Sequence, residues 1–278
     1  MNESLSTEEM KGKFDWEWDD GHVVPEVVNP EVEFLFRRMI EATYEKVNPR
    51  QGEKILDIGC GRGTDGVELA KKGAMVIGLE PSSIMIAHAK NHIAENNVNM
   101  ALVHGVGEYL PFGVCSLDKV MCKGALDHFL APEMVMRQIA TVLKPGGEAI
   151  IAIANFESLG FKLGKKVCSL RKVLGFKEGE GRLPWEIPSD HTYKFDYRLI
   201  KRMANSHLKV EQAIGVSLLF GLPWWGTFLD KCPRSVSSCI LNTLDRIARH
   251  LPSLSDVVIL RCRPRDEGLT LIQGNSTS

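Results

Sequence analysis

The most constraining feature of the chain is a strand-like run that breaks directly into three glycines at alternate positions. Residues 54–58 are mostly apolar, and Gly59, Gly61 and Gly63 follow at once. A helical pattern of apolar residues then begins near residue 64. Glycine adopts backbone conformations that other residues avoid, and a helix N-terminus presents free N–H groups. The segment therefore predicts a strand, a tight turn and a helix that together let a ligand approach bare backbone.

Strand-like and helical segments alternate through the first half of the chain. Helices of 10–15 residues between strands are typical of βαβ units, which form a parallel sheet. The pattern predicts an α/β, Rossmann-like, doubly wound fold. The expected strands are 54–58, 74–79, 100–104, 117–122 and 148–154, and the expected helices are 31–47, 64–72, 82–95, 132–143 and 197–206.

Composition narrows the class of protein further. The chain has 278 residues, 44% of them apolar, and a formal net charge of −1, so no general basic field argues for a nucleic-acid partner. Its seven cysteines form no C-x-x-C pair, which favours reduced thiols in a cytoplasmic protein. No ligand cluster with zinc or magnesium spacing is visible, so the sequence predicts independence of metal ions. The polar N-terminus resembles no signal peptide.

The spacing of the glycines indicates which ligand the turn accepts. It is G-x-G-x-G rather than the G-x-G-x-x-G of dinucleotide binders, which points away from NAD and toward S-adenosyl-L-methionine (SAM). Asp57, at the end of the strand, is placed to accept a hydrogen bond from a ligand ammonium group. Glu80 ends the next strand, where one carboxylate can accept both hydrogen bonds of a ribose diol.

Five motifs in the same order resemble the class I SAM-dependent methyltransferases, in particular the type that acts on small molecules. They lie at 55–63, 76–82, 107–112, 116–120 and 143–147. The resemblance implies a seven-stranded, mostly parallel sheet whose last strand is antiparallel, with 208–219 and 256–263 as strands six and seven. It also implies helical insertions and SAM as the cofactor.

Carried over position by position, the resemblance assigns cofactor-binding roles. Asp57 and Gly59 would meet the methionine part of SAM, and Glu80 would hold the ribose hydroxyls. The remaining implied cofactor-binding residues are Gly61, Gly63, Met85, Gly107, Glu108 and Lys123. One position departs from the pattern: relatives often have an aspartate that accepts from the adenine amino group, and this chain has Val106. Adenine would then depend on backbone N–H groups near Gly107 and on apolar contacts.

Methyl transfer needs alignment and water exclusion, and it needs a base only where the acceptor must lose a proton. Asp127 and His128 follow strand four and lie nearest the expected methyl position. His191 lies at the usual substrate-side rim, and His22 lies in the N-terminal arm. A histidine titrates near neutral pH and could take a hydroxyl proton. The candidate catalytic residues are therefore His128, Asp127 and His191, with His22 as a further possibility.

The predicted organisation is an N-terminal arm (1–30), one methyltransferase domain (31–265) and a flexible tail (266–278). Insertions at 156–190 and 221–253 are expected to cover the acceptor. Both carry aromatic and apolar residues, as does the arm with Trp16 and Trp18. The prediction is a bulky apolar small-molecule acceptor, quinone-like, polyketide or lipid-like, methylated at oxygen or carbon. The basic side of a helix at 235–251 offers a possible peripheral membrane contact.

Two other functions remain open on the sequence alone. The chain could be a nicotinamide-dependent oxidoreductase, which the glycine spacing disfavours. It could also bind SAM without turnover, as a sensor or scaffold, and the valine at 106 is compatible with that alternative.

Overall fold

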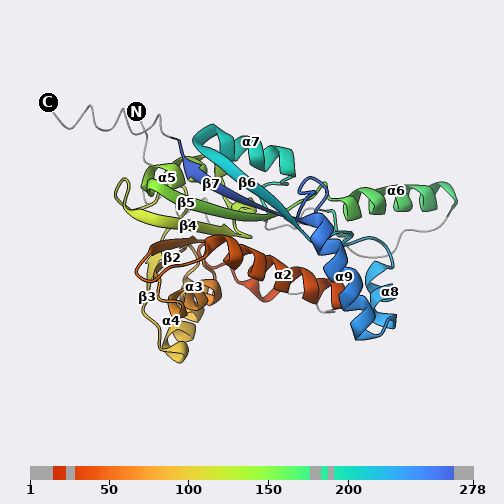
Figure 1. The fold of residues 1–278 in the computed structure, drawn as a ribbon, viewed down its shortest axis with the longest axis horizontal. Coiled ribbons are helices and arrows are strands. Elements are labelled where there is room, and N and C mark those ends of the chain that lie inside the picture. The colour runs from red at the N-terminus through yellow and green to blue at the C-terminus, as the bar shows by residue number, and fades with distance from the viewer. Residues whose placement is uncertain (1–14, 23–28, 176–182, 187–190, 266–278) are drawn as a thin grey trace.

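A computed structural model describes residues 15–22, 29–175, 183–186 and 191–265 (Figure 1). The predicted tail therefore lies outside the described residues, as does most of the predicted arm. The strands are β1 (Lys54–Ile58), β2 (Met75–Glu80), β3 (Met100–His104), β4 (Leu117–Lys123), β5 (Leu143–Ala154), β6 (Leu208–Val216) and β7 (Val257–Pro264). The helices are η1 (Asp20–His22), α2 (Pro30–Val47), α3 (Thr64–Lys71), α4 (Ser83–Asn96), η2 (Leu126–His128), α5 (Pro132–Val142), α6 (Leu159–Val173), α7 (Tyr197–His207), α8 (Trp225–Lys231) and α9 (Arg234–Ala248).

The seven strands form one sheet in the order β3-β2-β1-β4-β5-β7-β6. All neighbours from β3 to β5 are parallel, whereas β7 runs antiparallel to both β5 and β6. The predicted fold, including the antiparallel last strand, is confirmed. The strand order reverses between β1 and β4, so the carboxyl ends of these two strands flank the crevice where open α/β sheets bind ligands.

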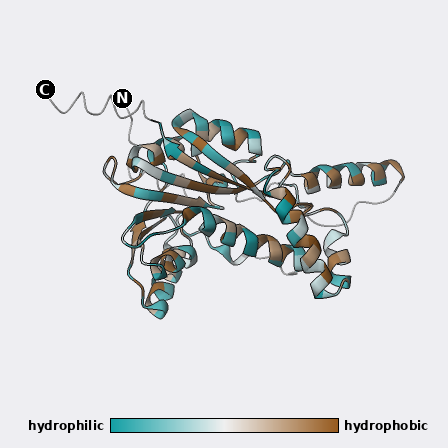
Figure 2. Cartoon of the chain, in the orientation of Figure 1, coloured by the Kyte–Doolittle hydropathy of each residue, from teal (hydrophilic) through white to brown (hydrophobic). Residues whose placement is uncertain are grey.

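Helices cover both faces of the sheet (Figure 1). Helices α5 and α7 lie on one face, and α2, α3 and α4 lie on the other, with α9 beside β6. Hydrophobic residues concentrate in the central strands, while each covering helix has one hydrophobic side (Figure 2). The alternating side chains of β1 show this division: Leu56 and Ile58 join the core beneath α5 and α7, and Ile55 joins the core on the opposite face.

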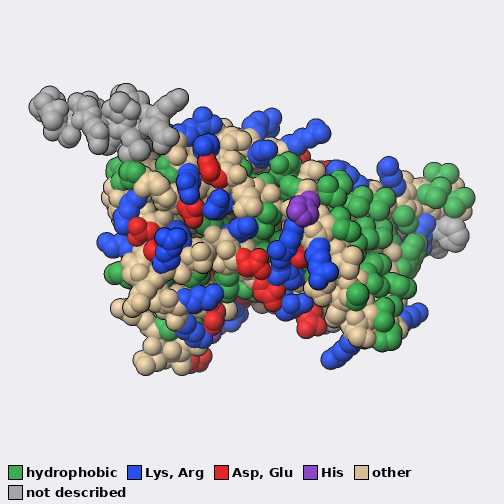
Figure 3. All heavy atoms as spheres, in the orientation of Figure 1, with side chains coloured by type: hydrophobic (Ala, Val, Ile, Leu, Met, Phe, Trp, Pro, Cys, Tyr) green, Lys and Arg blue, Asp and Glu red, His purple; other side chains and the backbone are tan. Residues whose placement is uncertain are grey.

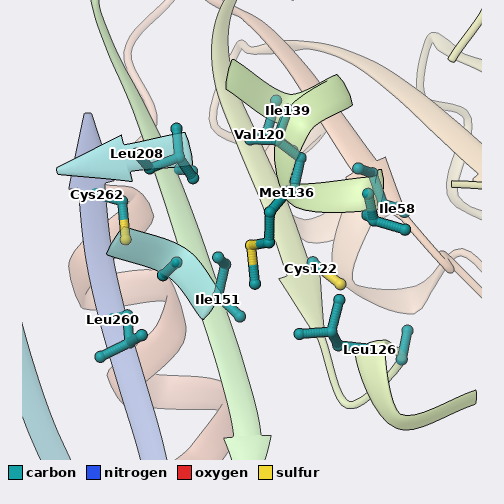
Figure 4. Close-up of a cluster of buried hydrophobic side chains, with 14 of the residues drawn as sticks. Ile58, Val120, Cys122, Leu126, Met136, Ile139, Ile151, Leu208, Leu260 and Cys262 are labelled. Atoms are coloured by element: carbon teal, nitrogen blue, oxygen red, sulfur yellow. The ribbon is translucent and has the colours of Figure 1, made fainter. Parts of the chain in front are cut away.

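The larger core lies between the sheet and helices α5 and α7. Figure 4 shows Ile58, Val120 and Cys122 from the strands meeting Met136 and Ile139 of α5. These side chains are at most 1% exposed. Close packing of this kind fixes the ends of β1 and β4 relative to each other, and those ends carry the predicted site.

Helix α2 is tied to the sheet by specific polar contacts. The Asn29 side chain caps its N-terminus by accepting from the Glu31 and Val32 backbone N–H groups. At its other end, the buried Lys119 ammonium donates to the Val47 and Asn48 carbonyls, at 2.8 and 2.9 Å. Because Lys119 belongs to β4, this contact holds α2 across the face that Asp57 occupies.

The structure corrects several predicted boundaries. The stretch 144–147 is not only a helix stop, because Leu143–Gly147 begin β5 and a register shift between Leu117 and Lys119 accommodates them. Strand β6 ends at Val216 rather than at residue 219, since Ser217 and Leu219 have positive φ angles of 58° and 72°. The insertion after β5 forms a helix, α6, that the sequence pattern did not predict. In the part of the chain that is described, no helix has the length and apolar character needed to span a bilayer.

Candidate functional site

The glycine turn after β1 has the backbone conformation that only glycine adopts easily. Gly59, Gly61 and Gly63 have φ angles of 69°, 52° and 73°, all in the left-handed region. A Cβ atom at Gly59 would lie 2.4 Å from the Cβ atom of Ala125, which follows β4. The turn after β1 and the segment after β4 therefore approach each other closely, and the floor of the crevice is backbone.

Asp57 lies directly beneath this turn as a buried carboxylate. It is 2% exposed, and its Oδ2 atom has no hydrogen-bond partner among the described residues. Burial raises the pKa of Asp57 well above its usual range, and the nearby Asp65 and Glu80 carboxylates raise that pKa further, whereas Lys123 lowers it. A buried acceptor left unsatisfied is costly. This end of the crevice is therefore suited to a ligand that brings a positive charge and an N–H donor.

A half-buried chain of polar contacts beside Asp57 joins three elements of the fold. The Tyr44 hydroxyl of α2 lies 2.8 Å from Asp65 Oδ1, and the Lys123 ammonium of β4 lies 2.9 Å from Asp65 Oδ2. Lys123 is thus at the predicted place, but its ammonium is paired with a helix α3 carboxylate. Sequence analysis missed Tyr44 and Asp65. The position of Asp65, two residues after the last glycine, was the available signal.

Glu80 connects the turns that follow β1 and β2. Its Oε2 atom accepts from the Gly61 backbone N–H at 2.9 Å, and its Oε1 atom accepts from the Ser82 N–H at 2.9 Å. Burial raises the pKa of Glu80, which the two backbone hydrogen bonds partly oppose. Each carboxylate oxygen has a further lone pair, so the group can still accept from a diol. The Glu80 carboxylate, which is predicted to bind the ribose, is therefore held rigidly by the two turns that line the crevice.

The predicted adenine-side residues have different surroundings. Met85 is 2% exposed, and its Cε methyl lies 3.5 Å from where a Gly61 Cβ would be. Val106 is also buried, and Gly107 contacts the Phe129 ring closely enough that a Cβ would lie 3.1 Å from it. Glu108 accepts from the Leu130 and Ala131 N–H groups at 2.9 and 3.2 Å. Its carboxylate thus anchors the segment that leads into α5, a role that sequence analysis did not foresee.

The described part of the N-terminal arm lies across both turns. The Ser83 N–H donates to the Trp16 carbonyl at 2.8 Å, and the Ser82 hydroxyl donates to the Trp18 carbonyl at 2.6 Å. Asp20 forms an ion pair with Arg62, the residue between two of the glycines, with an Nε–Oδ2 distance of 2.8 Å. The sequence suggested that the arm covers the acceptor. The structure shows it fastened to the turns that line the cofactor crevice.

The candidate bases come together at the C-terminal end of β4. His191 Nδ1 lies 3.0 Å from Asp127 Oδ2, and the His128 and His191 ring centroids are 4.6 Å apart. The Asp127 carbonyl accepts from the Thr192 and Tyr193 N–H groups, which fixes the distant segment beside η2. The side chain of the remaining candidate, His22, is not described, although the residue itself ends η1.

Asp127, His128 and His191 are also the described residues whose geometry could hold a metal ion. Their ligand atoms all lie within 4.8 Å of one another. Two imidazoles and one carboxylate form a donor set that transition-metal ions accept. The sequence-based expectation of metal independence overlooked this set, because the third residue is far away in the chain.

Comparisons with known proteins agree with this geometry. Residues 55–147 match the family described as Methyltransferase domain. Methyltransferase GfsG of Streptomyces halstedii is 33% identical over 140 residues, covering 49% of this chain and 48% of that protein. A ubiquinone biosynthesis O-methyltransferase of Coxiella burnetii is 32% identical over 105 residues, 38% of this chain and 45% of its own. A demethylmenaquinone methyltransferase of Corynebacterium kroppenstedtii is 32% identical over 120 residues, 43% of this chain and 48% of its own. The chain thus spans about half the length of these curated relatives.

Solved structures share the fold. The PH0226 protein of Pyrococcus horikoshii superposes with a TM-score of 0.57 at 15% identity, covering 89% of this chain and 100% of its own. The [4+2]-cyclase SpnF gives 0.54 at 16% identity, covering 82% and 80%. At such identities the likeness establishes the arrangement of strands and helices and nothing about the reaction.

The residues present fit the cofactor that the family uses, SAM. The unsatisfied Asp57 carboxylate suits its ammonium group, the glycine turn leaves room for it, and Glu80 offers acceptors for its ribose. The order of the strands, the glycine turn and the match over 55–147 agree with one another. Residues 55–147 of this chain therefore match a methyltransferase domain, and they lie in a fold with a crevice that suits SAM.

Proposed function

We propose that this chain transfers a methyl group from SAM to an oxygen or carbon atom of a bulky, apolar small molecule. The observation that carries the proposal is the position of the Asp127–His191 pair. Asp127 lies two residues beyond Ala125, which packs against the glycine turn, and Asp127 holds His191 beside it. A candidate base and the cofactor crevice therefore share one wall. The quinone-methylating relatives support an acceptor of this kind.

When SAM is bound, it supplies an electrophilic methyl group on its sulfonium. The protein's contribution is to hold the reactants in line and to keep water away. Asp57 would bind the ammonium and Glu80 the ribose hydroxyls. The Trp18 and Phe156 rings flank the two histidines, with centroid distances of 5.5 Å from Trp18 to His128 and 6.2 Å from Phe156 to His191. These rings would exclude water from the acceptor side.

Proton removal from a hydroxyl acceptor is assigned to His191. Its Nδ1 faces the Asp127 carboxylate, which favours the tautomer with the proton on Nδ1 and an acceptor lone pair on Nε2. That Nε2 atom would accept the acceptor's proton during methyl transfer, while Asp127 stabilises the resulting imidazolium. The His128 ring meets the His191 ring edge to face and would limit rotation of the His191 side chain.

An aromatic wall leads from His191 toward the insertions. Phe156 contacts His191 on one side and Phe161 on the other, and Phe161 in turn contacts Trp185 and Phe220, all at centroid distances of 6.1–6.4 Å. Trp185 also lines a cavity of about 370 Å³ between α6 and the segment 221–227. A wall of this composition suits a large apolar acceptor better than a polar one.

The test is turnover with reduced quinone and catechol acceptors, measured as S-adenosylhomocysteine formed. His191→Gln should lower kcat about 100-fold or more while the SAM Kd stays unchanged, because a general base contributes to the chemical step. His92→Gln, the same change on α4, is the matched control. SAM binding without turnover on any acceptor would favour the binding-protein alternative. Equal kcat for wild type and His191→Gln would remove His191 as the base.

A further inference from the structure

Helix α6 projects from the body of the molecule (Figure 1). Its inner side is held by close contacts at two glycines. A Cβ at Gly160 would lie 2.3 Å from the Phe220 carbonyl oxygen, and one at Gly164 would lie 2.3 Å from the Trp185 ring. These contacts lie in the first half of the helix. The second half extends beyond the sheet and its covering helices.

The outer side of α6 carries large apolar side chains that face solvent. Leu170, Val173 and Leu174 are 60%, 83% and 63% exposed, and Leu163 is 36% exposed. Leu163, Leu170 and Leu174 are spaced by seven and four residues, so they share one stripe of the helix. Contiguous exposed apolar surface marks an interaction site more often than scattered single residues do.

The same helix is strongly basic. It contains Lys162, Lys165, Lys166, Arg171 and Lys172 and no acidic residue, in a chain whose overall formal charge is −1. Lys165 pairs with Glu157, which precedes the helix, whereas Lys162 and Lys166 are exposed. Apolar residues and cations are thus gathered on one projecting element.

The surface continues onto α8. The Arg171 guanidinium lies 5.3 Å from the Trp224 ring, which is 62% exposed, and Phe228 of α8 is 51% exposed. Figure 3 shows hydrophobic side chains gathered over the end of the molecule that α6, α8 and α9 form. We call the exposed residues Leu163, Leu170, Val173, Leu174, Trp224 and Phe228, with the α6 cations, the α6–α8 surface.

We propose that the α6–α8 surface docks on an anionic lipid bilayer. Apolar side chains of an amphipathic helix enter the boundary between headgroups and acyl chains, while neighbouring cations are attracted to anionic headgroups. An exposed tryptophan suits that boundary, because its ring is apolar and its N–H is polar. A second copy of this chain is a poorer occupant, since two such basic helices would repel each other.

This location overlaps only in part with the membrane contact that the sequence suggested in the insertion 221–253. Trp224 and Phe228 belong to that insertion, but the suggested basic helix at 235–251 is not part of the α6–α8 surface. There, Arg249 forms ion pairs with Glu45 of α2 and Asp245 of its own helix, at 3.7 and 3.6 Å. The basic end of α9 therefore faces α2 and neighbouring acids. The cations of α6 lie instead beside exposed apolar residues.

Docking would also explain how a tailed acceptor reaches the site. The 370 Å³ cavity is lined by Cys168, Arg171 and Lys172 of α6 and by residues 221–224, so it opens beside the proposed contact. An acceptor with a long apolar tail could pass from the bilayer to the aromatic wall without crossing water. This consequence rests on the proposed methyl transfer, whereas docking itself does not.

The experiment is flotation of the full chain with lipid vesicles. Wild type should float with vesicles containing about 30 mol% phosphatidylglycerol, float much less with pure phosphatidylcholine, and lose binding as salt rises from about 0.1 M to about 0.5 M. Val173→Asp and the double variant Lys162→Glu, Lys166→Glu should each reduce the bound fraction about fivefold or more. These positions are exposed, so the fold should tolerate the changes.

Matched controls are Val114→Asp and Lys90→Glu, both at exposed positions away from α6. They should float like wild type, and all variants should keep the wild-type SAM Kd, so that loss of docking is separated from loss of the cofactor site. No flotation of wild type, or equal flotation of the α6 variants and the controls, would overturn the proposal. A wild-type dimer that Val173→Asp converts to a monomer would overturn it in favour of self-association.

Discussion

The cofactor half of the site and the acceptor half place their buried acidic residues in different surroundings. Asp57 and Glu80, at the ends of β1 and β2, lie at the sheet edge where open α/β folds bind ligands, so a ligand can supply donors and positive charge. Glu31 and Asp256 lie beside the insertions, and burial raises the pKa of Glu31 to about 8 and that of Asp256 to about 7. The first pair is arranged for a charged ligand. In the second pair, burial raises both pKa values and the Asp256 carboxylate raises that of Glu31 further, so protons rather than a ligand reduce the buried charge.

The two halves also differ in how well they match known proteins. The match to the methyltransferase family covers residues 55–147, which contain the cofactor half, and omits the insertions. A common cofactor imposes the same turns and carboxylates on every member of a family. The acceptor differs between members, so the elements over it are free to differ. Variants in each half test whether cofactor binding and acceptor binding are as separate as this comparison implies.

The largest expected effect is on cofactor affinity when Glu80 is truncated. Glu80→Ala removes the predicted ribose acceptor and frees the Gly61 and Ser82 N–H groups. Calorimetric titration should show the Kd for SAM and for S-adenosylhomocysteine raised about 100-fold or more. Glu68→Ala, on the exposed side of α3, is the control and should bind like wild type. Wild-type affinity in Glu80→Ala would contradict the assignment of the crevice.

The next effect is on stability and belongs to the acceptor half. Glu31 has a pKa of about 8 when folded and near its ordinary value of 4.5 when unfolded, so between these pH values the folded state binds more protons. The free energy of unfolding should therefore fall as pH rises from about 5 to about 8. Glu31→Gln stays neutral and should be more stable than wild type by about 2 kcal/mol near pH 6.

Thermal unfolding at several pH values measures this change. The slope of Tm against pH should be smaller in Glu31→Gln than in wild type, and Glu33→Gln, an exposed neighbour on α2, should keep the wild-type slope. Parallel slopes in all three proteins would show that Glu31 is charged when folded. The acceptor half would then resemble the cofactor half, and the comparison would fail.

A smaller effect is expected where the arm joins the two halves. Trp18 contacts His128 on the acceptor side, while its carbonyl is held by Ser82 on the cofactor side. Trp18→Ala keeps the backbone contact but removes the ring that packs against His128, so the arm is held less firmly across the turns of the cofactor crevice. SAM should then dissociate about tenfold faster, because about 1.4 kcal/mol of contact between the Trp18 ring and the body of the protein is lost. Stopped-flow displacement measures the rate. Glu17→Ala, an exposed change in the same arm, should leave the rate as in wild type.

The two halves also differ in how far the sequence could predict them. Local patterns sufficed for the parallel strands and the glycine turn, because each depends on residues that are neighbours in the chain. The cofactor roles of Asp57 and Glu80 come from the same patterns and stay predictions. The Tyr44–Asp65–Lys123 chain was missed because it joins three elements whose packing decides the contacts. Helix α6 was missed because its apolar residues face solvent, so its pattern marks no buried face.

The candidate bases show the same limit. Asp127, His128 and His191 were each proposed from position, but their proximity depends on the backbone contact between Asp127 and residues 192–193. Periodicity within one element carries no information on such a contact. For the same reason no sequence pattern indicates that the three side chains could share a metal ion.

The smallest expected effect is that of metal removal, and it decides how the acceptor half activates its substrate. His191 Nδ1 and Asp127 Oδ2 are already 3.0 Å apart, close enough for the carboxylate to orient the imidazole without a metal ion. EDTA should therefore leave kcat unchanged within about twofold, a change worth only about 0.4 kcal/mol of activation free energy. Activity lost in EDTA and restored by Zn²⁺ or Mn²⁺ would instead make the three residues metal ligands. His191→Gln would then weaken binding of the added metal ion, a change that calorimetry detects without turnover, and the cofactor half would remain as assigned because its SAM Kd is measured separately.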